Sequence, residues 1–300
     1  IVIVAGDPNQ VVNDFDGADP AFFENVNLPT VLLDRSYRVP KQHMAAAEAL
    51  LSNAHSPPPV MPDNEGGELM EYRSPRFWYS RESGWDVPSA AQEGSPAALV
   101  EKYGTDTMFL ARTQRQVAGI GAALRRAGII YDTQADLQGW GTETRLAVFN
   151  ALQKMTDVSP SDFGQHGGSL KHYTGDDGKS VSTATELRPF EAAELLRVTK
   201  SKYLADTRSE ISDIADQIEE DGNPVSLREL DEYVESEFWR VYSQGAGAVS
   251  SLNKTGGSKA LDDDEKRTLT AALEQNDVPV DPDSIETQAL TIHASKGQDR

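Results

Sequence analysis

Three short segments place polar side chains directly after an apolar run of the chain. They are Gly6–Gln10 (Gly-Asp-Pro-Asn-Gln), Asp34–Pro40 (Asp-Arg-Ser-Tyr-Arg-Val-Pro) and Thr291–Asp299 (Thr-Ile-His-Ala-Ser-Lys-Gly-Gln-Asp). The backbone N–H groups of a turn that holds glycine and lysine suit a phosphate, so the third segment is typical of an anion-binding turn. Taken alone, the first segment is equally typical of an ordinary tight turn, and the second of a helix start with a solvated arginine.

The apolar runs predict strands of a parallel sheet. Ile1–Ala5 and Thr30–Leu33 are continuously apolar, the pattern of strands buried on both faces. A strand over Thr107–Ala111, a helix over Gln114–Ala127 and a strand over Ile129–Tyr131 make a βαβ unit, which builds parallel sheets covered by helices. Because ligands of open parallel sheets bind outside the carboxyl ends of the strands, we expect the three polar segments to lie at such ends.

Between the second polar segment and the βαβ unit the pattern is weaker. Pro40 favours a helix over Lys41–Leu51, and the proline-rich segment Ser56–Gly67 is expected to be a loop. A short strand is expected at Glu68–Arg73 and a helix at Ala90–Tyr103.

From about Thr133 the pattern becomes helical. Residues 134–283 carry 29 acidic and 15 basic residues, so this half contributes −14 of the net charge of −20. The α/β pattern returns only at Thr287–Ile292, which indicates an all-helical insertion. Its helices are expected over Thr142–Met155, Pro189–Glu219, Leu227–Ser243 and Asp262–Gln275.

The composition excludes several classes of protein. The chain has no cysteine, which rules out disulfide scaffolds, thiolate zinc sites and cysteine nucleophiles. It has no apolar run near the roughly 20 residues of a membrane span, so we expect a cytoplasmic protein without a membrane partner. The chain is rich in Asp (26 residues) and poor in Lys (11 residues). This favours adaptation to a salt-rich, halophilic cytoplasm over an acidic interaction surface, because charges are screened within about 3 Å at 1 M salt.

The three polar segments resemble motifs of superfamily 1 DNA helicases of the UvrD/Rep type. The strand Phe109–Thr113 (Phe-Leu-Ala-Arg-Thr), which stands between the second and the third segment, resembles a further motif, and all four follow the family's order. The segment Gly6–Gln10 is similar to motif III, Asp34–Pro40 to motif IV and Thr291–Asp299 to motif V. The resemblance covers residues 1–133 and 284–300.

The resemblance implies a division of the chain. It makes residues 1–34 the carboxyl edge of the first RecA-like lobe (1A), and residues 35–133 and 284–300 the second RecA-like lobe (2A). Residues 134–283 would be the helical insertion called 2B. The expected fold class is therefore α/β, a RecA-like parallel sheet with a large all-helical, 2B-like insertion.

The resemblance also implies the residues of a nucleotide site. Gln10 would sense the terminal phosphate of ATP, and Arg38 would be the arginine finger that neutralises charge during phosphoryl transfer. The other candidates at this site are Tyr37, expected to stack on the adenine, Asp299, facing the ribose, and Gly6 and Asp7 of the motif III turn. ATP and Mg²⁺ are the implied cofactors, and no metal ligand is assigned within this chain.

A second set of candidates would contact DNA. Phe15 matches an aromatic side chain on which a base of single-stranded DNA stacks, although it would equally suit a core position. Four other residues match family positions that contact the DNA backbone or couple the DNA to the ATP site: Arg112, Thr291, His293 and Lys296. For His293 a hydrogen-bonded structural role is the alternative.

The implied function is ATP-dependent unwinding of duplex DNA by movement along one strand. The Walker A and B motifs that ATP hydrolysis needs are not among these residues, and Gly175–Ser180 only imitates the end of a Walker A loop. We therefore expect a part of a longer helicase, with motifs I, Ia and II before Ile1 and motif VI after Arg300, and no ATPase activity in the chain alone.

Two alternatives stay open. One is a motor-dead scaffold whose acidic insertion recruits a protein partner, and the other is the helicase lobe of a RecB-like helicase–nuclease. A Walker A sequence encoded upstream of Ile1 would distinguish the motor from the scaffold. For the motor, single-stranded and duplex DNA are the expected partners.

Overall fold

A computed structural model of the chain forms two units, residues 1–73 and 74–300, and the division falls within residues 35–133. The residues that the structure describes are 29, 31, 35–51, 61–64, 66–72, 76–80, 84–134, 140, 143–156, 185–253 and 261–295. Within them the fold is α/β, with many helices and a small parallel sheet, as the sequence predicts.

The first unit contains a βαβ arrangement. Strand β1 (Arg35–Pro40) and strand β2 (Met61–Asn64) are parallel neighbours, and helix α2 (Lys41–Leu51) connects them in sequence. The helix has the predicted bounds. Strand β2 instead forms within Ser56–Gly67, the segment that was predicted to be a loop. A proline is tolerated in this strand because a strand at the edge of a sheet uses fewer of its backbone N–H groups as donors.

The strand predicted at Glu68–Arg73 is not formed over residues 66–72. The backbone N–H of Leu69 instead donates to Gln42 Oε1 of α2, at 3.2 Å. A side chain of the helix thus satisfies a backbone group that a strand partner was expected to satisfy.

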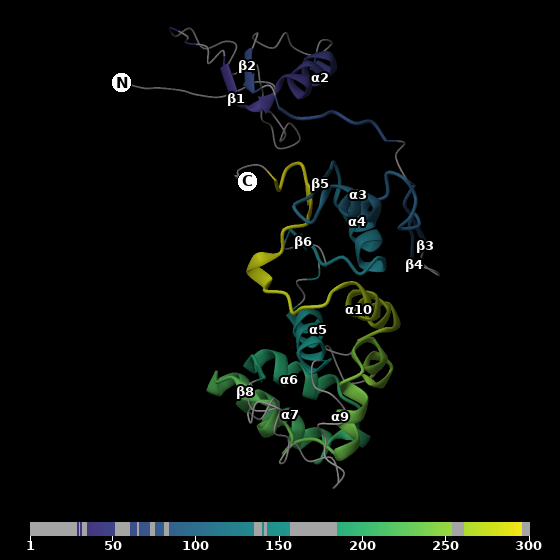
Figure 1. Cartoon of the computed structure of the whole chain (residues 1–300), viewed down its shortest axis with the longest axis vertical. Helices are drawn as coiled ribbons and strands as arrows, with labels where there is room; N and C mark the ends of the chain where they lie inside the picture. Colours follow the sequence, from purple (N-terminus) through teal and green to yellow (C-terminus); the bar gives the residue numbers. More distant parts are fainter. Residues whose placement is uncertain are drawn as a thin grey trace, which may run out of the picture. The chain divides into compact units, whose positions relative to one another are not determined.

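The second unit is organised by a three-stranded parallel sheet (Figure 1). Its strands are β5 (Met108–Ala111), β6 (Asp132–Thr133) and β9 (Gln288–Thr291), in the spatial order β5–β9–β6. Strand β9 therefore enters between the two strands of the predicted βαβ unit. The chain leaves the sheet after β6, forms the helical segment, and returns to the middle of the same sheet.

Helix α4 (Gln114–Arg126) joins β5 to β6 and follows the prediction closely. Thr113 caps it by accepting the backbone N–H of Gln116, and the Gln116 side chain accepts the backbone N–H of Thr113 in return. Gly128 follows the helix with a φ of +74°, a conformation that favours glycine. The strand predicted at Ile129–Tyr131 forms later, at β6 (Asp132–Thr133), where pairing with β9 starts. Ile130 and Tyr131 come before this pairing and are buried in the core.

Two further elements precede the sheet in sequence. Strands β3 (Trp78–Ser80) and β4 (Gly84–Asp86) form an antiparallel hairpin that the sequence pattern does not predict. Helix α3 (Pro96–Tyr103) is shorter than expected, because Ser95 caps its start: the Ser95 hydroxyl accepts the backbone N–H of Ala98.

In its described residues, the segment between β6 and β9 is mainly helical. It also holds a two-residue antiparallel ladder of β7 (Glu186–Leu187) with β8 (Val225–Ser226). The predicted helix Pro189–Glu219 is broken, because Thr207 starts a new helix with its own capping box. The α-helices are α5 (Glu143–Thr156), α6 (Pro189–Val198), α7 (Arg208–Asp221), α8 (Leu227–Leu230), α9 (Ser236–Tyr242) and α10 (Asp263–Gln275). The 3₁₀ helices are η6 (Ser201–Tyr203), η7 (Gly245–Ser251) and η9 (Pro282–Ser284).

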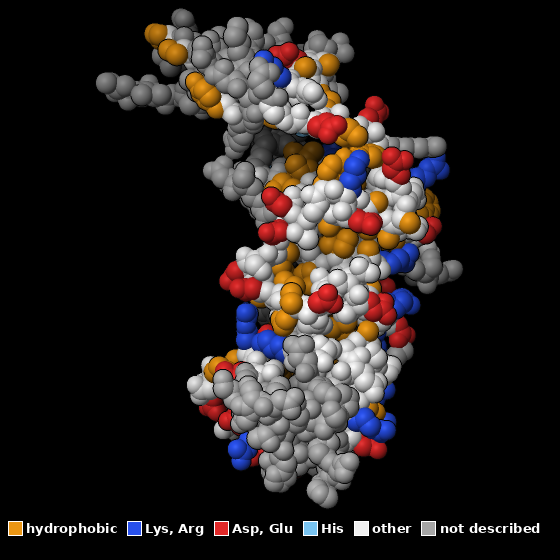
Figure 2. All heavy atoms as spheres, viewed as in Figure 1, with side chains coloured by type: hydrophobic (Ala, Val, Ile, Leu, Met, Phe, Trp, Pro, Cys, Tyr) orange, Lys and Arg blue, Asp and Glu red, His pale blue; other side chains and the backbone are white. Residues whose placement is uncertain are grey.

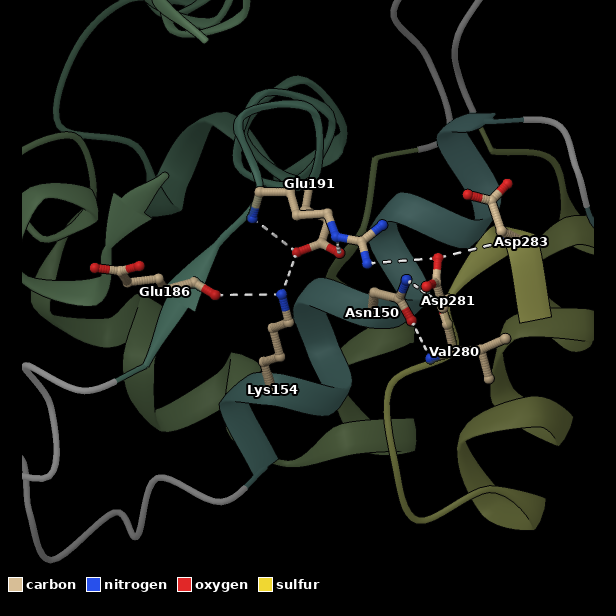
Figure 3. A network of polar contacts seen from close by, with 8 residues as sticks. Asn150, Lys154, Glu186, Glu191, Val280, Asp281 and Asp283 are labelled. Carbon is tan, nitrogen blue, oxygen red and sulfur yellow. Dashed lines mark hydrogen bonds and ion pairs between the residues drawn. The ribbon is translucent and has the colours of Figure 1, made fainter. Parts of the chain in front are cut away.

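A polar network ties this helical segment to the chain that returns to the sheet (Figure 3). Asn150 of α5 is fully engaged with the backbone of Val280, donating to its carbonyl and accepting its N–H, both at 2.8 Å. One turn further along α5, Lys154 Nζ lies 2.7 Å from the buried Glu191 carboxylate of α6. Helix α5 therefore connects α6 with the approach to β9.

The surface of the described residues mixes both signs of charge. On the face drawn in Figure 2, Asp and Glu side chains are spread among Lys and Arg and do not gather into one patch. No described helix combines the length and apolar character that a membrane span requires.

Candidate functional site

The carboxyl ends of β5 and β9 lie side by side at one edge of the sheet. Ala111 is the register partner of Thr291, and the backbone N–H of Ile292 donates to the Ala111 carbonyl at 2.9 Å. Arg112 and His293 therefore leave the sheet from adjacent strands. The fold brings together two of the predicted DNA-contacting positions, which belong to opposite ends of the second unit's sequence.

Thr291 is buried at the start of the turn that follows β9. Its hydroxyl donates to Gln134 Oε1 at 2.8 Å and accepts the backbone N–H of Ala294 at 3.2 Å. Its carbonyl accepts the N–H of Ser295 at 3.0 Å. With its donor used inside the protein, Thr291 fixes the turn and does not offer that proton to a phosphate.

Arg112 and His293 are both exposed. Neither side chain forms an ion pair or hydrogen bond with another residue that the structure describes. The capping box at Thr113 fixes the backbone next to Arg112, and the Thr291 turn fixes the backbone before His293. The edge thus presents a guanidinium and an imidazole to solvent from a rigid backbone, which suits an anion such as a phosphodiester.

Two predicted nucleotide-site residues lie on strand β1 of the first unit. Tyr37 is 72% exposed on β1, so its ring is accessible for stacking. Arg38 lies in the same strand, and its side chain is outside the described part of the chain.

Six other predicted residues lie outside the described residues: Gly6, Asp7, Gln10, Phe15, Lys296 and Asp299. The expected convergence of Gln10 and Arg38 on one phosphate therefore stays a prediction. So do the base-stacking role of Phe15 and the phosphate contact of Lys296.

Sequence reasoning missed Gln134, whose Oε1 accepts both the hydroxyl and the backbone N–H of Thr291. A signal was present, because Gln134 follows the second strand of the βαβ unit and parallel strands end at one edge. The spacing Thr113 to Gln116 is likewise the signature of a capping box.

Across the described ranges, no three His, Asp or Glu side chains come together as ligands for a metal ion. Comparison of the sequence and structure with models of protein families, with curated proteins and with solved structures gives no match.

Proposed function

We propose that this chain is part of an ATP-dependent DNA helicase or translocase that moves along single-stranded DNA. The observation that carries the proposal is the pairing of β5 with β9, which puts Arg112 and His293 on one edge. These are the positions at which the motif resemblance expects contact with the DNA backbone.

The topology supports a RecA-like assignment for the second unit. Parallel strands with a connecting helix are the unit from which such sheets are built, and their ligands bind at the carboxyl edge. The helical segment, which leaves after β6 and returns through β9, fits a 2B-like insertion into the second lobe. The all-parallel order β5–β9–β6 brings the chain back into the same sheet after the helical segment, which is compatible with an insertion into one lobe.

ATP and Mg²⁺ enter the proposal through the resemblance alone. When bound, ATP supplies a phosphoryl transfer whose energy drives movement. Of this chain's residues, the exposed Tyr37 fits a stacking contact with the adenine. Since no Walker A or B motif occurs within these 300 residues, we propose that the chain by itself binds DNA without hydrolysing ATP.

The test is binding of a fluorescent oligothymidylate of about 20 nucleotides, followed by anisotropy at pH 7. Arg112→Ala and His293→Ala should each weaken binding about three-fold or more, because each removes one backbone contact. Arg267→Ala is the matched control: it also removes one exposed arginine, whose partner is Asp264 on the same helix.

Equal affinities for the two edge variants and the parent chain would contradict the proposal for this edge. A chain that hydrolysed ATP with DNA-stimulated turnover would contradict the expectation drawn from the missing Walker motifs.

A further inference from the structure

The hairpin of β3 and β4 exposes large aromatic side chains. Trp78 is 67% exposed and Tyr79 is 45% exposed, whereas Trp140 and Trp239 are fully buried. Tyr79 lies opposite Trp85 across the ladder, with ring centroids 5.3 Å apart, and Trp78 lies opposite Asp86 on the other face. The ribbon therefore carries one accessible aromatic ring on each face.

The hairpin packs against helix α4, and Figure 1 shows the two side by side. A Cβ atom added at Gly119 would lie 3.0 Å from Phe77 Cβ and 3.2 Å from Trp85 Cζ3, so the aromatic residues pack directly on the helix backbone. Arg126 Nη2 donates to the Trp85 carbonyl at 3.0 Å. These contacts hold the ribbon at a defined place while Trp78 and Tyr79 remain accessible.

Arginines lie on helix α4 where the hairpin packs against it, and next to the hairpin in sequence. Arg115 and Arg126 lie four residues before and seven residues after Gly119, which puts all three on one stripe of α4. Arg76 lies two residues before the hairpin in sequence and is exposed. The segment Arg73–Asp86 holds three arginines against one glutamate and one aspartate, in a chain of net charge −20.

Most arginines of the helical segment differ from these three, although Arg208 and Arg228 also form no ion pair with a described carboxylate. Arg76, Arg115 and Arg126 form no ion pair with a carboxylate of the described residues. In the helical segment, by contrast, ion pairs with Asp or Glu are formed by Arg145, Arg188, Arg197, Arg240 and Arg267. In an acidic protein, exposed arginines that have no described carboxylate partner, close in the fold to exposed aromatic rings, fit a ligand that offers both negative charge and flat apolar surface.

We propose that this hairpin is a binding site for single-stranded nucleic acid. One base stacks on Trp78 and another base of the same strand stacks on Tyr79, on the two faces of the ribbon, and the phosphates lie against Arg76, Arg115 and Arg126. Stacking on aromatic rings together with arginine contacts is the chemistry by which proteins hold single strands without sequence preference. The Asp86 carboxylate beside Trp78 repels phosphates, which directs the backbone toward the α4 side.

This site extends the proposed function by a second contact with the same polymer, and it rests on that function for the choice of a nucleic acid over a protein. It involves neither the edge at Arg112 and His293 nor ATP. The two sites can therefore fail separately.

The test compares variants of the complete 300-residue chain for binding of fluorescent oligothymidylate and oligouridylate in about 0.1 M KCl. Trp78→Ala should weaken binding about ten-fold, and Trp78→Phe, which keeps a ring, should recover most of the loss. Tyr103→Ala, which removes another exposed aromatic ring, is the matched control and should bind as the parent does. A preference for one of the two polymers identifies DNA or RNA as the ligand.

Arg115→Ala and Arg126→Ala should each weaken binding and reduce its salt dependence by about one counterion. Unchanged affinity of the Trp78 and arginine variants would overturn the proposal. So would a change of sedimentation in Trp78→Ala without a change in oligonucleotide affinity, because the ring would then belong to an interface between copies. If these variants lose affinity while the Arg112 and His293 variants do not, the hairpin site stands and the edge proposal fails.

Discussion

Gln134 and Thr291 are joined by two hydrogen bonds across 157 residues of sequence. Gln134 Oε1 accepts the Thr291 hydroxyl at 2.8 Å and its backbone N–H at 3.1 Å. The end of β6 thereby holds the first residue of the turn after β9. The position of His293 at the sheet edge depends on this contact as well as on the strand pairing.

Replacing Gln134 should loosen that turn. Gln134→Ala leaves the buried hydroxyl and N–H of Thr291 without their acceptor, so we expect a loss of about 2 kcal/mol in the free energy of unfolding. Gln134→Glu keeps an acceptor oxygen and should lose less. Urea denaturation followed by circular dichroism measures both, and equal losses for the two variants would show that the acceptor oxygen is not what matters.

The buried Tyr242 predicts a pH dependence of stability in the alkaline range. Its hydroxyl donates to the Ser251 carbonyl at 3.0 Å, and burial raises the pKa of Tyr242 to about 12. Below pH 10 the phenol is neutral in both the folded and the unfolded chain. Between pH 10 and 12 the unfolded chain ionises first and binds fewer protons, so the free energy of unfolding falls, by about 3 kcal/mol in all.

Tyr242→Phe removes that ionisation and should flatten the dependence between pH 10 and 12. The exposed Tyr103→Phe should leave the slope as it is in the parent chain. The slopes are compared rather than the absolute stabilities, because Tyr242→Phe also loses the hydrogen bond to Ser251. Equal slopes for the parent chain and Tyr242→Phe would contradict the assignment.

The net negative charge of the chain predicts that salt stabilises the folded state. A net charge of −20 disfavours the compact state through self-repulsion, and screening shortens its range from about 10 Å at 0.1 M salt to about 3 Å at 1 M. We expect the free energy of unfolding to rise by more than about 1 kcal/mol between 0.1 and 2 M KCl. Sodium chloride should act equally, since screening depends on ionic strength, and a fall in stability would count against salt adaptation.

Local signals predicted the elements that their own residues define. The ends of α4 carry local signals in Thr113 and Gly128, although the capping box at Thr113 was not used in its prediction. Pro40 marks the start of α2, because caps and prolines act on the nearest backbone groups. The apolar run before Ile292 likewise predicts β9. Each of these depends on neighbours in sequence, which is why one sequence was enough.

Contacts between distant segments could not be predicted in the same way. The order β5–β9–β6 and the pairing of Gln134 with Thr291 depend on where the chain returns after the helical segment. The break between α6 and α7 is a different case, since the Thr207–Glu210 capping box is a local sign of a new helix that the prediction missed. Only the contact of Arg208 with the carbonyls at the end of α6 depends on the tertiary fold. The hairpin escaped prediction because its strands are three residues long and its stabilising partner, Gly119, lies on another element.

Arg197 holds three carboxylates between α6 and α7. It forms ion pairs with the fully buried Glu194 at 2.6 Å and with Asp216 and Glu219 of α7. Burial lowers the pKa of Arg197, but the hydrogen bonds that it donates to Glu219, Glu194 and Asp216 outweigh that effect and leave the pKa above its usual value. The guanidinium is thus charged throughout, and its loss would leave the Glu194 carboxylate buried without this cation.

We expect Arg197→Met to lose about 3–5 kcal/mol in the free energy of unfolding, since breaking a buried ion pair by removing one partner uncovers the desolvation cost of the other. The double variant Glu194→Leu with Arg197→Met should recover most of that loss, because it removes the buried charge as well. Arg240→Ala, whose pair with Glu237 is exposed on both sides, should change stability by less than about 0.5 kcal/mol. Urea denaturation of these chains, together with the single variant Glu194→Leu that completes the cycle, measures the coupling. A double variant no more stable than Arg197→Met would show that Arg197 acts through Asp216 and Glu219 of α7 and not through the charge of Glu194.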